Sequence, residues 1–235
     1  MTKSTVQQIR ERFDQDVARF SNLETGQLST IDAKRTLDLI TEAARRIVPK
    51  AEHLLDVGCG AGNYTLMMLY KLPQLNCTLV DLSQPMLDKA LERVAGQGVK
   101  SVDAVRGDIR EILLPENHFE IILAGAVLHH LRDDEDWEYV FKKLYRSLKL
   151  GGCLMISDLV IQDVEGVNDY VWEQYGDYLQ QIGGKEYRDK VMAYIAEEDS
   201  PRSLTYQLDL MRKVGFSQTE ILHKNLCFAA FGGIK

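Results

Sequence analysis

Three glycines close to residue 60 carry the clearest chemical signal in this sequence. Gly58, Gly60 and Gly62 stand at alternate positions after the apolar run 54–57, which has the composition of a buried parallel strand. A helical pattern opens at Tyr64. Glycine lacks a Cβ, so it adopts the angles of a tight turn and lets a ligand lie against the main chain. The helix start offers unpaired N–H groups to a carboxylate or phosphate, and we therefore expect a nucleotide-type cofactor here.

The spacing of these glycines separates two kinds of cofactor. A nicotinamide or flavin fingerprint, G-x-G-x-x-G, would place glycine at position 63, where this chain has Asn63. An acidic residue, Asp56, stands two positions before the first glycine. This G-x-G-x-G form after an acidic strand residue resembles motif I of the class I S-adenosylmethionine-dependent methyltransferases. The resemblance implies S-adenosylmethionine as the cofactor and disfavours a nicotinamide oxidoreductase.

Two further carboxylates follow strand-like runs. Asp81 ends the run 77–81, where a carboxylate can accept hydrogen bonds from both ribose hydroxyls. Leu82 and Met86 are candidates for the face of the adenine ring, although both also suit helix–sheet packing. Asp108 and Ile109 follow the weaker run 101–106. Their Gly-Asp-apolar step resembles the methyltransferase clamp on adenine, although a lone Gly-Asp step is more often a turn.

Two adjacent histidines follow the fourth strand-like run, 119–124. Methyl transfer is an in-line displacement at a sulfonium carbon, so the protein chiefly positions the nucleophile and excludes water. A base is required only where the nucleophile must lose a proton, and His129 and His130 are the candidates. The alternative is that they hydrogen-bond only to the main chain. For the cofactor, the resemblance implies contacts from Asp56, Gly58, Cys59, Gly60, Gly62, Asn63, Asp81, Leu82, Met86, Asp108, Ile109, Ala124 and Ala126.

No metal site is expected from the sequence. Catechol-type methyltransferases hold a divalent ion with carboxylates after the fourth and fifth strands. Asp158 suits the second of these positions, but Ala124, Gly125 and Ala126 offer no carboxylate at the first. The acidic run 133–136 has the pattern of a solvated helix start.

Strand and helix patterns alternate along the middle of the chain, which predicts an α/β fold with a doubly wound sheet. The resemblance implies a seven-stranded, mostly parallel Rossmann-like sheet whose last strand is antiparallel. We expect a single domain over 1–235. It consists of N-terminal cap helices at 1–49, a cofactor-binding core at 50–159, a helical lid insertion at 160–203, and a closing helix with two strands at 204–235.

The segments around the core also have local signals. Apolar residues at helical spacing predict one helix over 6–20, a break at 21–26 and a second helix over 32–48. Such helices cover a sheet face or cap the cofactor and substrate. After the helix that starts in the run 133–136, Leu150, Gly151 and Gly152 have the pattern of a glycine C-cap before a strand at 153–157.

The insertion at 160–203 is the predicted substrate lid. Tyr170, Trp172, Tyr175 and Tyr178 are candidates to line a pocket, although about half of its aromatic residues should pack on the sheet. Ten acidic and four basic residues give the stretch a charge of −6. Because such a lid repels an RNA backbone, we expect a small-molecule acceptor rather than a nucleic-acid partner.

Composition is ordinary for a globular enzyme. The 235 residues are 45% hydrophobic and 27% charged, with a net charge of −7. The four cysteines form no C-x-x-C pair, which favours buried thiols in a reducing compartment. The sequence shows no apolar leader and no long apolar segment, so we expect a cytoplasmic monomer or homodimer away from membranes.

Two alternatives stay open beside a small-molecule methyltransferase. The insertion and the stretch 212–216 also resemble carboxy-S-adenosylmethionine synthase, a methyltransferase-fold enzyme of tRNA modification. Such an enzyme transfers no methyl group and requires a cation near the cofactor methyl. The other alternative is a non-catalytic protein that binds S-adenosylmethionine and regulates a partner. The regular glycine loop favours the unmodified cofactor.

Overall fold

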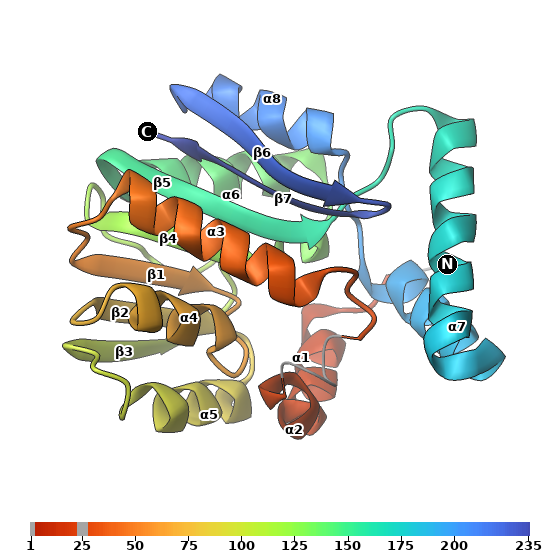
Figure 1. The fold of residues 1–235 in the computed structure, drawn as a ribbon, viewed down its shortest axis with the longest axis horizontal. Coiled ribbons are helices and arrows are strands. Elements are labelled where there is room, and N and C mark those ends of the chain that lie inside the picture. The colour runs from red at the N-terminus through yellow and green to blue at the C-terminus, as the bar shows by residue number, and fades with distance from the viewer. Residues whose placement is uncertain (1–2, 23–27) are drawn as a thin grey trace.

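The computed structural model describes residues 3–22 and 28–235, and a seven-stranded sheet organises them (Figure 1). The strands lie in the order β3-β2-β1-β4-β5-β7-β6. In chain order they are β1 (His53–Val57), β2 (Asn76–Asp81), β3 (Ser101–Arg106), β4 (Phe119–Gly125), β5 (Leu148–Leu159), β6 (Gln218–Asn225) and β7 (Phe228–Ile234). Only the last strand, β7, runs antiparallel to its neighbours. The predicted α/β sheet with an antiparallel last strand is confirmed.

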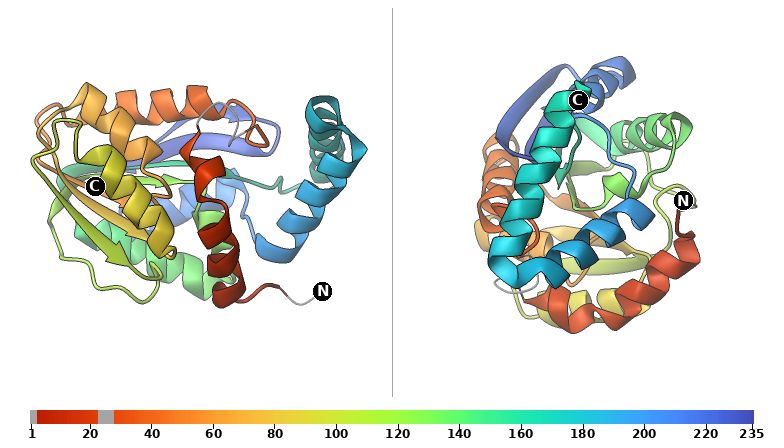
Figure 2. Two further views of the ribbon diagram at one scale, coloured as in Figure 1. Left: turned by 90° about the horizontal axis from the view of Figure 1, so that it is seen from below. Right: turned by 90° about the vertical axis from the view of Figure 1, so that its right-hand side faces the viewer.

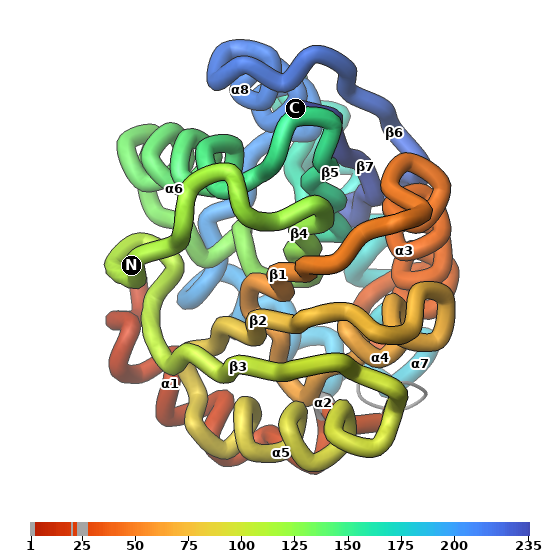
Figure 3. Tube along the Cα trace, turned by 90° about the vertical axis from the view of Figure 1, so that its left-hand side faces the viewer, coloured from red at the N-terminus to blue at the C-terminus, as the bar shows by residue number. Residues whose placement is uncertain are grey.

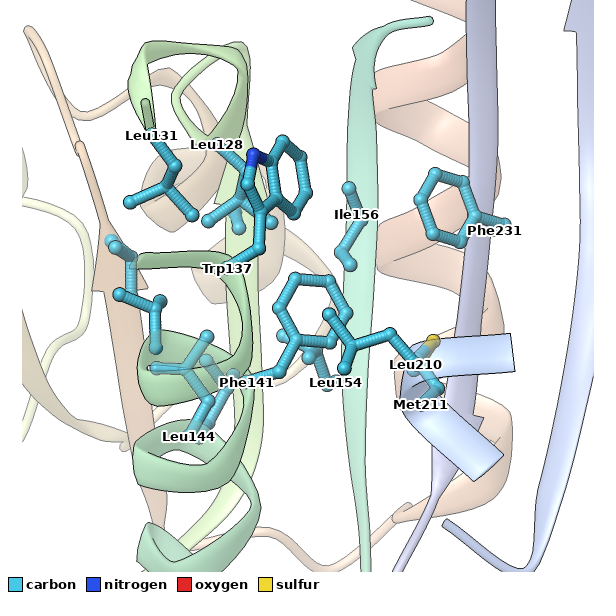
Figure 4. Packing of buried hydrophobic residues seen from close by; sticks show 14 of the residues in the cluster. Leu128, Leu131, Trp137, Phe141, Leu144, Leu154, Ile156, Leu210, Met211 and Phe231 are labelled. Carbon is cyan, nitrogen blue, oxygen red and sulfur yellow. The ribbon is translucent and has the colours of Figure 1, made fainter. Parts of the chain in front are cut away.

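Helices cover both faces of this sheet (Figure 3). Those of one face are α3 (Ala33–Ile47), α4 (Asn63–Lys71) and α5 (Gln84–Val94), and they share a buried apolar cluster with the strands. On the other face lie α6 (Asp134–Ser147) and α8 (Leu204–Val214). Figure 4 shows the second cluster, in which Trp137 and Phe141 of α6 meet Leu154 and Ile156 of β5. Because helices cover both faces of the sheet, the residues of β1 and β4 are mostly apolar.

The N-terminal segment forms two helices rather than one. The prediction of a single helix over 6–20 is wrong, because α1 (Val6–Gln15) ends at Asp16 and α2 (Val17–Ser21) follows it. Asp16 has φ −102° and ψ 12°, so the backbone turns between them. Thr5 caps α1 in a reciprocal capping box with Gln8. The predicted break at 21–26 lies mostly outside the described residues, and α3 confirms the second helix.

The insertion forms one long kinked helix, α7 (Glu165–Glu198). Its kink is at Gly184, whose φ of 80° and ψ of 178° are not helical. Figures 1 and 2 show α1 and α7 beyond the carboxyl ends of the parallel strands. A third apolar cluster, which includes Tyr175 and Leu179, packs α7 against Leu159 and Phe228. None of the described helices is long and apolar enough to cross a bilayer.

The predicted glycine C-cap at 150–152 is also wrong. Helix α6 ends at Ser147, and β5 begins at once with Leu148, which pairs with Phe119 of β4. Gly151 has φ 78° within the first residues of β5 and so serves an irregularity of that strand. The four cysteines are buried free thiols, as predicted.

Candidate functional site

The glycine loop between β1 and α4 needs glycine at each of its three positions. Gly58, Gly60 and Gly62 all have positive φ, at 64°, 50° and 81°. A Cβ on Gly58 would lie 2.4 Å from Val127, whereas a Cβ on Gly60 would meet nothing within 4 Å. The Gly60 N–H donates to the Asp81 carboxylate at 2.8 Å. The loop is therefore fixed by its neighbours and leaves the space over Gly60 free for a ligand.

Asp56 lies behind this loop and holds the start of α4. It is fully buried, and its Oδ2 accepts hydrogen bonds from the Thr65 backbone N–H at 3.1 Å and the Thr65 hydroxyl at 2.6 Å. Burial raises the pKa of Asp56 to about 7, and the nearby charge of Asp81 adds to the shift. Any influence of Asp56 on a ligand thus passes through the loop.

Two neighbouring cavities open at the carboxyl ends of β1, β2 and β4. The Asp108 cavity is lined by residues that include Val57, Val80, Gly107, Asp108, Ile109 and Arg110. The glycine-loop cavity is lined by residues that include Gly58, Cys59, Gly60, Asn63, Tyr64, Met86 and Ala126. Gly58, Asp81, Leu82, Val127 and His130 line both. Ten of the sequence-predicted cofactor residues thus border a cavity, whereas Asp56, Gly62 and Ala124 are absent from both linings.

Each of the two cavity carboxylates is already engaged. Asp81 accepts N–H bonds from Gly60 and Ser83, each through a different oxygen, which leaves acceptor capacity on both oxygens. Asp108 pairs with Arg110, whose guanidinium also bonds Asp136 at 2.8 Å. Although partial burial opposes ionisation, the bonds from Arg110 lower the pKa of Asp108. Both side chains keep free lone pairs for hydroxyl or amino donors.

The segment after β4 enters the glycine-loop cavity under backbone strain. Ala126 has φ 53°, an angle that costs a residue with a Cβ about 1 kcal/mol or more. Its N–H donates to the Ser157 carbonyl at 2.8 Å, which holds it in place. Gly125 admits the ring of Tyr64, since a Cβ there would lie 2.2 Å from that ring. Strain of this kind is typical of ligand sites.

The two histidines occupy the short 3₁₀ turn η1 (Leu128–His130), and only His129 bonds Asp158. His129 is buried, and its Nδ1 bonds the Asp158 carboxylate, which also accepts the backbone N–H groups of Leu128 and His129. Although burial disfavours its charge, Asp158 and Asp199 raise the pKa of His129 to about 9. Burial and the charge of His129 lower the pKa of His130. Only His130 of the pair lines the cavities.

The four aromatic residues that the sequence suggested for a substrate pocket do not line either of the described cavities. The hydroxyls of Tyr175 and Tyr178 donate to the carbonyls of Ser29 and Leu28, each at 2.8 Å. Trp172 packs edge-on against Tyr175, and Tyr170 is 58% exposed. These four side chains are not part of the described lining of either cavity. The Tyr175 and Tyr178 hydroxyls fix the turn at 28–30, which itself reaches the glycine-loop cavity through Ser29 and Thr30.

The sequence predicted N-terminal cap helices but named none of their residues as cavity walls. Val6 and Ile9 of α1 line the Asp108 cavity, and Phe13 lines the glycine-loop cavity. Their spacing on one helical face was visible, but nothing local shows which surface that face covers. Asp199 was missed as well, because only the fold brings the end of α7 to His129 and His130.

Comparison with known proteins identifies the cofactor chemistry of the site. A family model of the methyltransferase domain matches residues 54–152, which run from β1 into β5 and include the glycine loop and both histidines. The chain is an S-adenosylmethionine-dependent methyltransferase. The residues fit this cofactor, because the space over Gly60 and the spare acceptor capacity of Asp81 and Asp108 suit an amino-acid end, ribose hydroxyls and an adenine amino group.

Two relatives and one solved structure show how far the likeness to this methyltransferase extends. A demethylmenaquinone methyltransferase of Listeria monocytogenes serotype 4a (strain HCC23) is 26% identical over 235 residues, which cover 98% of this chain and 95% of the relative. A carboxy-S-adenosyl-L-methionine synthase of Vibrio atlanticus (strain LGP32) is 25% identical over 196 residues, covering 82% and 80%. Human N-acetylserotonin methyltransferase, solved with its cofactor, shares the fold with a TM-score of 0.63 at 16% identity, covering 98% of this chain and 57% of that one.

Proposed function

We propose that this methyltransferase methylates a small-molecule acceptor that binds in the glycine-loop cavity beside His130. Asp81 and Leu82 line both cavities, which supports a ribose position at their junction. An adenine ring beside Asp108 then leaves the glycine-loop cavity to the amino-acid end and the sulfonium. When bound, the cofactor supplies an activated methyl group. The acceptor must approach the same cavity, since in-line attack requires close contact with that methyl.

The observation that carries this proposal is the composition of the glycine-loop cavity. Phe13, Tyr64 and Val127 give it apolar walls, and Ser29, Thr30 and His130 add a few polar groups. This mixture is typical of small-molecule sites. Among its described lining residues there is no Lys or Arg, so the cation that a carboxylated sulfonium requires is missing. The −6 charge of the insertion at 160–203 disfavours an RNA acceptor.

The two histidines take different roles in this proposal. His130 contacts the acceptor, because it alone of the pair lines the cavity. His129 lies behind it and holds the turn, because its Nδ1 and backbone N–H both bond Asp158. The α1 helix and the turn at 28–30 exclude water from the cavity through Phe13, Ser29 and Thr30.

Transfer of a CD₃ group tests the proposal. The full chain is incubated with CD₃-labelled S-adenosylmethionine and either demethylmenaquinone, the low-molecular-mass fraction of a cell extract, or total tRNA, and products are identified by mass spectrometry. We expect a CD₃-labelled small molecule. A carboxylated sulfonium with no labelled acceptor, or label confined to tRNA, would contradict the proposal.

A pair of variants tests the assignment of His130. His130→Ala should keep the cofactor dissociation constant within about threefold and reduce turnover by about a hundredfold, because the loss of this wall residue misplaces the acceptor. His118→Ala is the matched control, since His118 stands at the opposite end of β4 beside His53. Equal turnover in the two variants would remove His130 from the acceptor site.

A further inference from the structure

Three side chains from two distant segments converge beside the glycine-loop cavity. His129 and His130 come from the turn η1, and Asp199 follows the last residue of α7. The Asp199 Oδ1 atom lies 3.3 Å from His130 Nδ1 and 3.7 Å from His129 Nε2. One nitrogen or oxygen of each residue falls within 4.8 Å of the others. Tetrahedral bonds of 2.0–2.1 Å place neighbouring ligand atoms about 3.3 Å apart, and the two separations from Asp199 are close to this value.

The polar atoms at this point lack partners. Asp199 Oδ1 and both ring nitrogens of His130 are buried, and none makes a hydrogen bond with any described residue. The 3.3 Å approach of Asp199 to His130 is therefore close but misaligned. The Asp199 side chain is only 2% exposed. A buried carboxylate oxygen without a donor is costly, and an ion between these atoms would give Asp199 Oδ1 and His130 Nδ1 a partner.

The surroundings of His129 have the form of a metal ligand's outer shell. Its Nδ1 bonds the Asp158 carboxylate, so with the proton on Nδ1 the lone pair of Nε2 is available on the side of Asp199. Histidine ligands almost always donate their second ring N–H to a carboxylate or carbonyl in this way. Asp158 is itself held by the N–H groups of Leu128 and Leu159, at 2.8 Å each.

Three positively charged side chains near Asp199 form their hydrogen bonds and ion pairs with groups other than its carboxylate. Lys3 donates to the main-chain carbonyls of Ala196 and Asp199. Arg132 donates to the carbonyls of Ser4 and Glu198, and Arg12 pairs with the Glu198 carboxylate. These bonds are not to the Asp199 Oδ1 atom. The two carboxylates of Asp158 and Asp199 would balance one divalent ion, which would bind in place of the second ring proton that they favour on His129.

We propose that His129 Nε2, His130 Nδ1 and Asp199 Oδ1 bind a divalent transition-metal ion of the zinc type. Two imidazoles and one carboxylate match the ligand chemistry of zinc and leave a fourth coordination position open. This site goes beyond the proposed methyl transfer and does not depend on it. It replaces the sequence-based expectation of no metal, which rested on the residues after β4 and β5 and did not include Asp199.

Metal binding by the untagged full chain tests this site. The protein is dialysed against micromolar zinc and then against metal-free buffer, and bound zinc is measured by mass spectrometry. Cobalt is titrated separately, because tetrahedral Co²⁺ gives visible absorption bands. We expect about one zinc per chain and a cobalt spectrum of four-coordinate type. Wild-type protein that retains no zinc and gives no cobalt band overturns the proposal.

Variants locate the ion. Asp199→Asn and His130→Gln should each weaken zinc binding by about tenfold or more, since even outer-shell changes cost this much. His118→Gln is the matched control and should bind zinc like the wild type. Equal affinity in Asp199→Asn and His118→Gln would overturn the proposal. Titration with S-adenosylmethionine shows whether each variant is folded. If a variant does not fold, the zinc content and the cobalt spectrum of the wild-type protein test the proposal without it. Zinc without methyl transfer would separate the metal site from the proposed function, and the reverse result would refute the site alone.

Discussion

Gly60 and Ala126 face the glycine-loop cavity with nearly the same left-handed backbone angle, φ 50° and 53°. Glycine adopts this angle without cost, whereas alanine is held there by its bond to Ser157. At Gly60 the absence of a side chain has a second consequence. The space that a Cβ would fill is open, and it is the space that we assign to the amino-acid end of the cofactor.

Gly60→Ala should therefore weaken S-adenosylmethionine binding by about tenfold or more, because its methyl group enters the ligand's space as well as straining the loop. Gly151→Ala is the matched control. Gly151 has φ 78°, and a Cβ there would also meet no atom within 4 Å, but it lies at the start of β5, away from both cavities. Calorimetric titration should show wild-type affinity in the control, and equal loss in both variants would show that strain alone is responsible.

Asp56 gives a pH dependence whose sign follows from its burial. Its pKa is raised to about 7 in the folded protein from a value of 3.8, so between these values the folded state holds a proton that the unfolded chain has lost. This contribution to stability is present at low pH and is lost as the pH rises toward 7, on the order of 4 kcal/mol at most.

Asp56→Asn should remove this dependence of stability on pH, because the amide oxygen still accepts hydrogen bonds from Thr65 but does not titrate. Urea unfolding of both proteins between pH 4 and 7 measures the difference. The wild type should lose stability relative to the variant across this range. Parallel curves would mean that Asp56 titrates normally in the folded state.

At the scale of elements, α1 covers the two cavities and α7 holds α1 in place. Arg12 of α1 donates to the Glu198 carboxylate at 2.9 and 2.8 Å and to the Tyr194 hydroxyl at 2.9 Å. The Ser4 N–H donates to the Glu197 carbonyl at 3.0 Å. The helix that these bonds hold contributes Ile9 and Phe13 to the cavity walls. The insertion thus acts on the site mainly through α1 and Asp199.

Arg12→Gln should loosen this cover, because it leaves the Glu198 carboxylate, whose side chain is 8% exposed, without its charge partner. Breaking a buried pair costs about 3 kcal/mol, and less here because Arg12 is partly exposed. We expect faster amide exchange in α1 and a cofactor affinity lowered by about tenfold.

Arg46→Gln is the control for this change, since its pair with Glu42 has Arg46 at 74% exposure. It should leave α1 exchange and affinity unchanged. Wild-type exchange in the Arg12→Gln variant would refute the fastening role.

Local sequence signals predicted the helices and strands far better than they predicted which of these elements pack together. The strand Ser101–Arg106 has the predicted bounds, and the helix Asn63–Lys71 begins one residue before the predicted Tyr64, because glycine turns, caps and apolar periods lie in adjacent residues. The break at Asp16 has no such signal. Gly151 satisfies a C-cap pattern, yet pairing of Leu148 with Phe119 extends β5 instead. Tertiary contacts also bring Phe13 to the glycine-loop cavity and Asp199 to the two histidines, from segments far apart in the sequence.

At the scale of the whole molecule, the two cavities lie where the sheet reverses its winding. β1 pairs with β2 on one side and β4 on the other, and ligands of open α/β sheets bind at such a crossing. The two cavities there are bounded by the N-terminal segment and by the loops after β1, β2, β3 and β4. A ligand that touches all of these segments ties the molecule together, so its binding should stabilise the entire fold.

S-adenosylmethionine at a hundredfold excess over its dissociation constant should add about 2.7 kcal/mol to stability. For a chain of this size that raises Tm by roughly 5–10 °C. NADH at the same concentration should leave Tm unchanged, since Asn63 replaces the glycine of the nicotinamide fingerprint. Differential scanning calorimetry measures both. A shift with NADH and none with S-adenosylmethionine would contradict this cofactor preference.

The most direct measurement is mass spectrometry of the ligand carried by gently purified, full-length protein. We predict S-adenosylmethionine or its demethylated product, bound one per chain, and the same ligand in the Gly151→Ala control but depleted in Gly60→Ala. A carboxylated sulfonium in its place would contradict methyl transfer and make the protein a synthase of the modified cofactor.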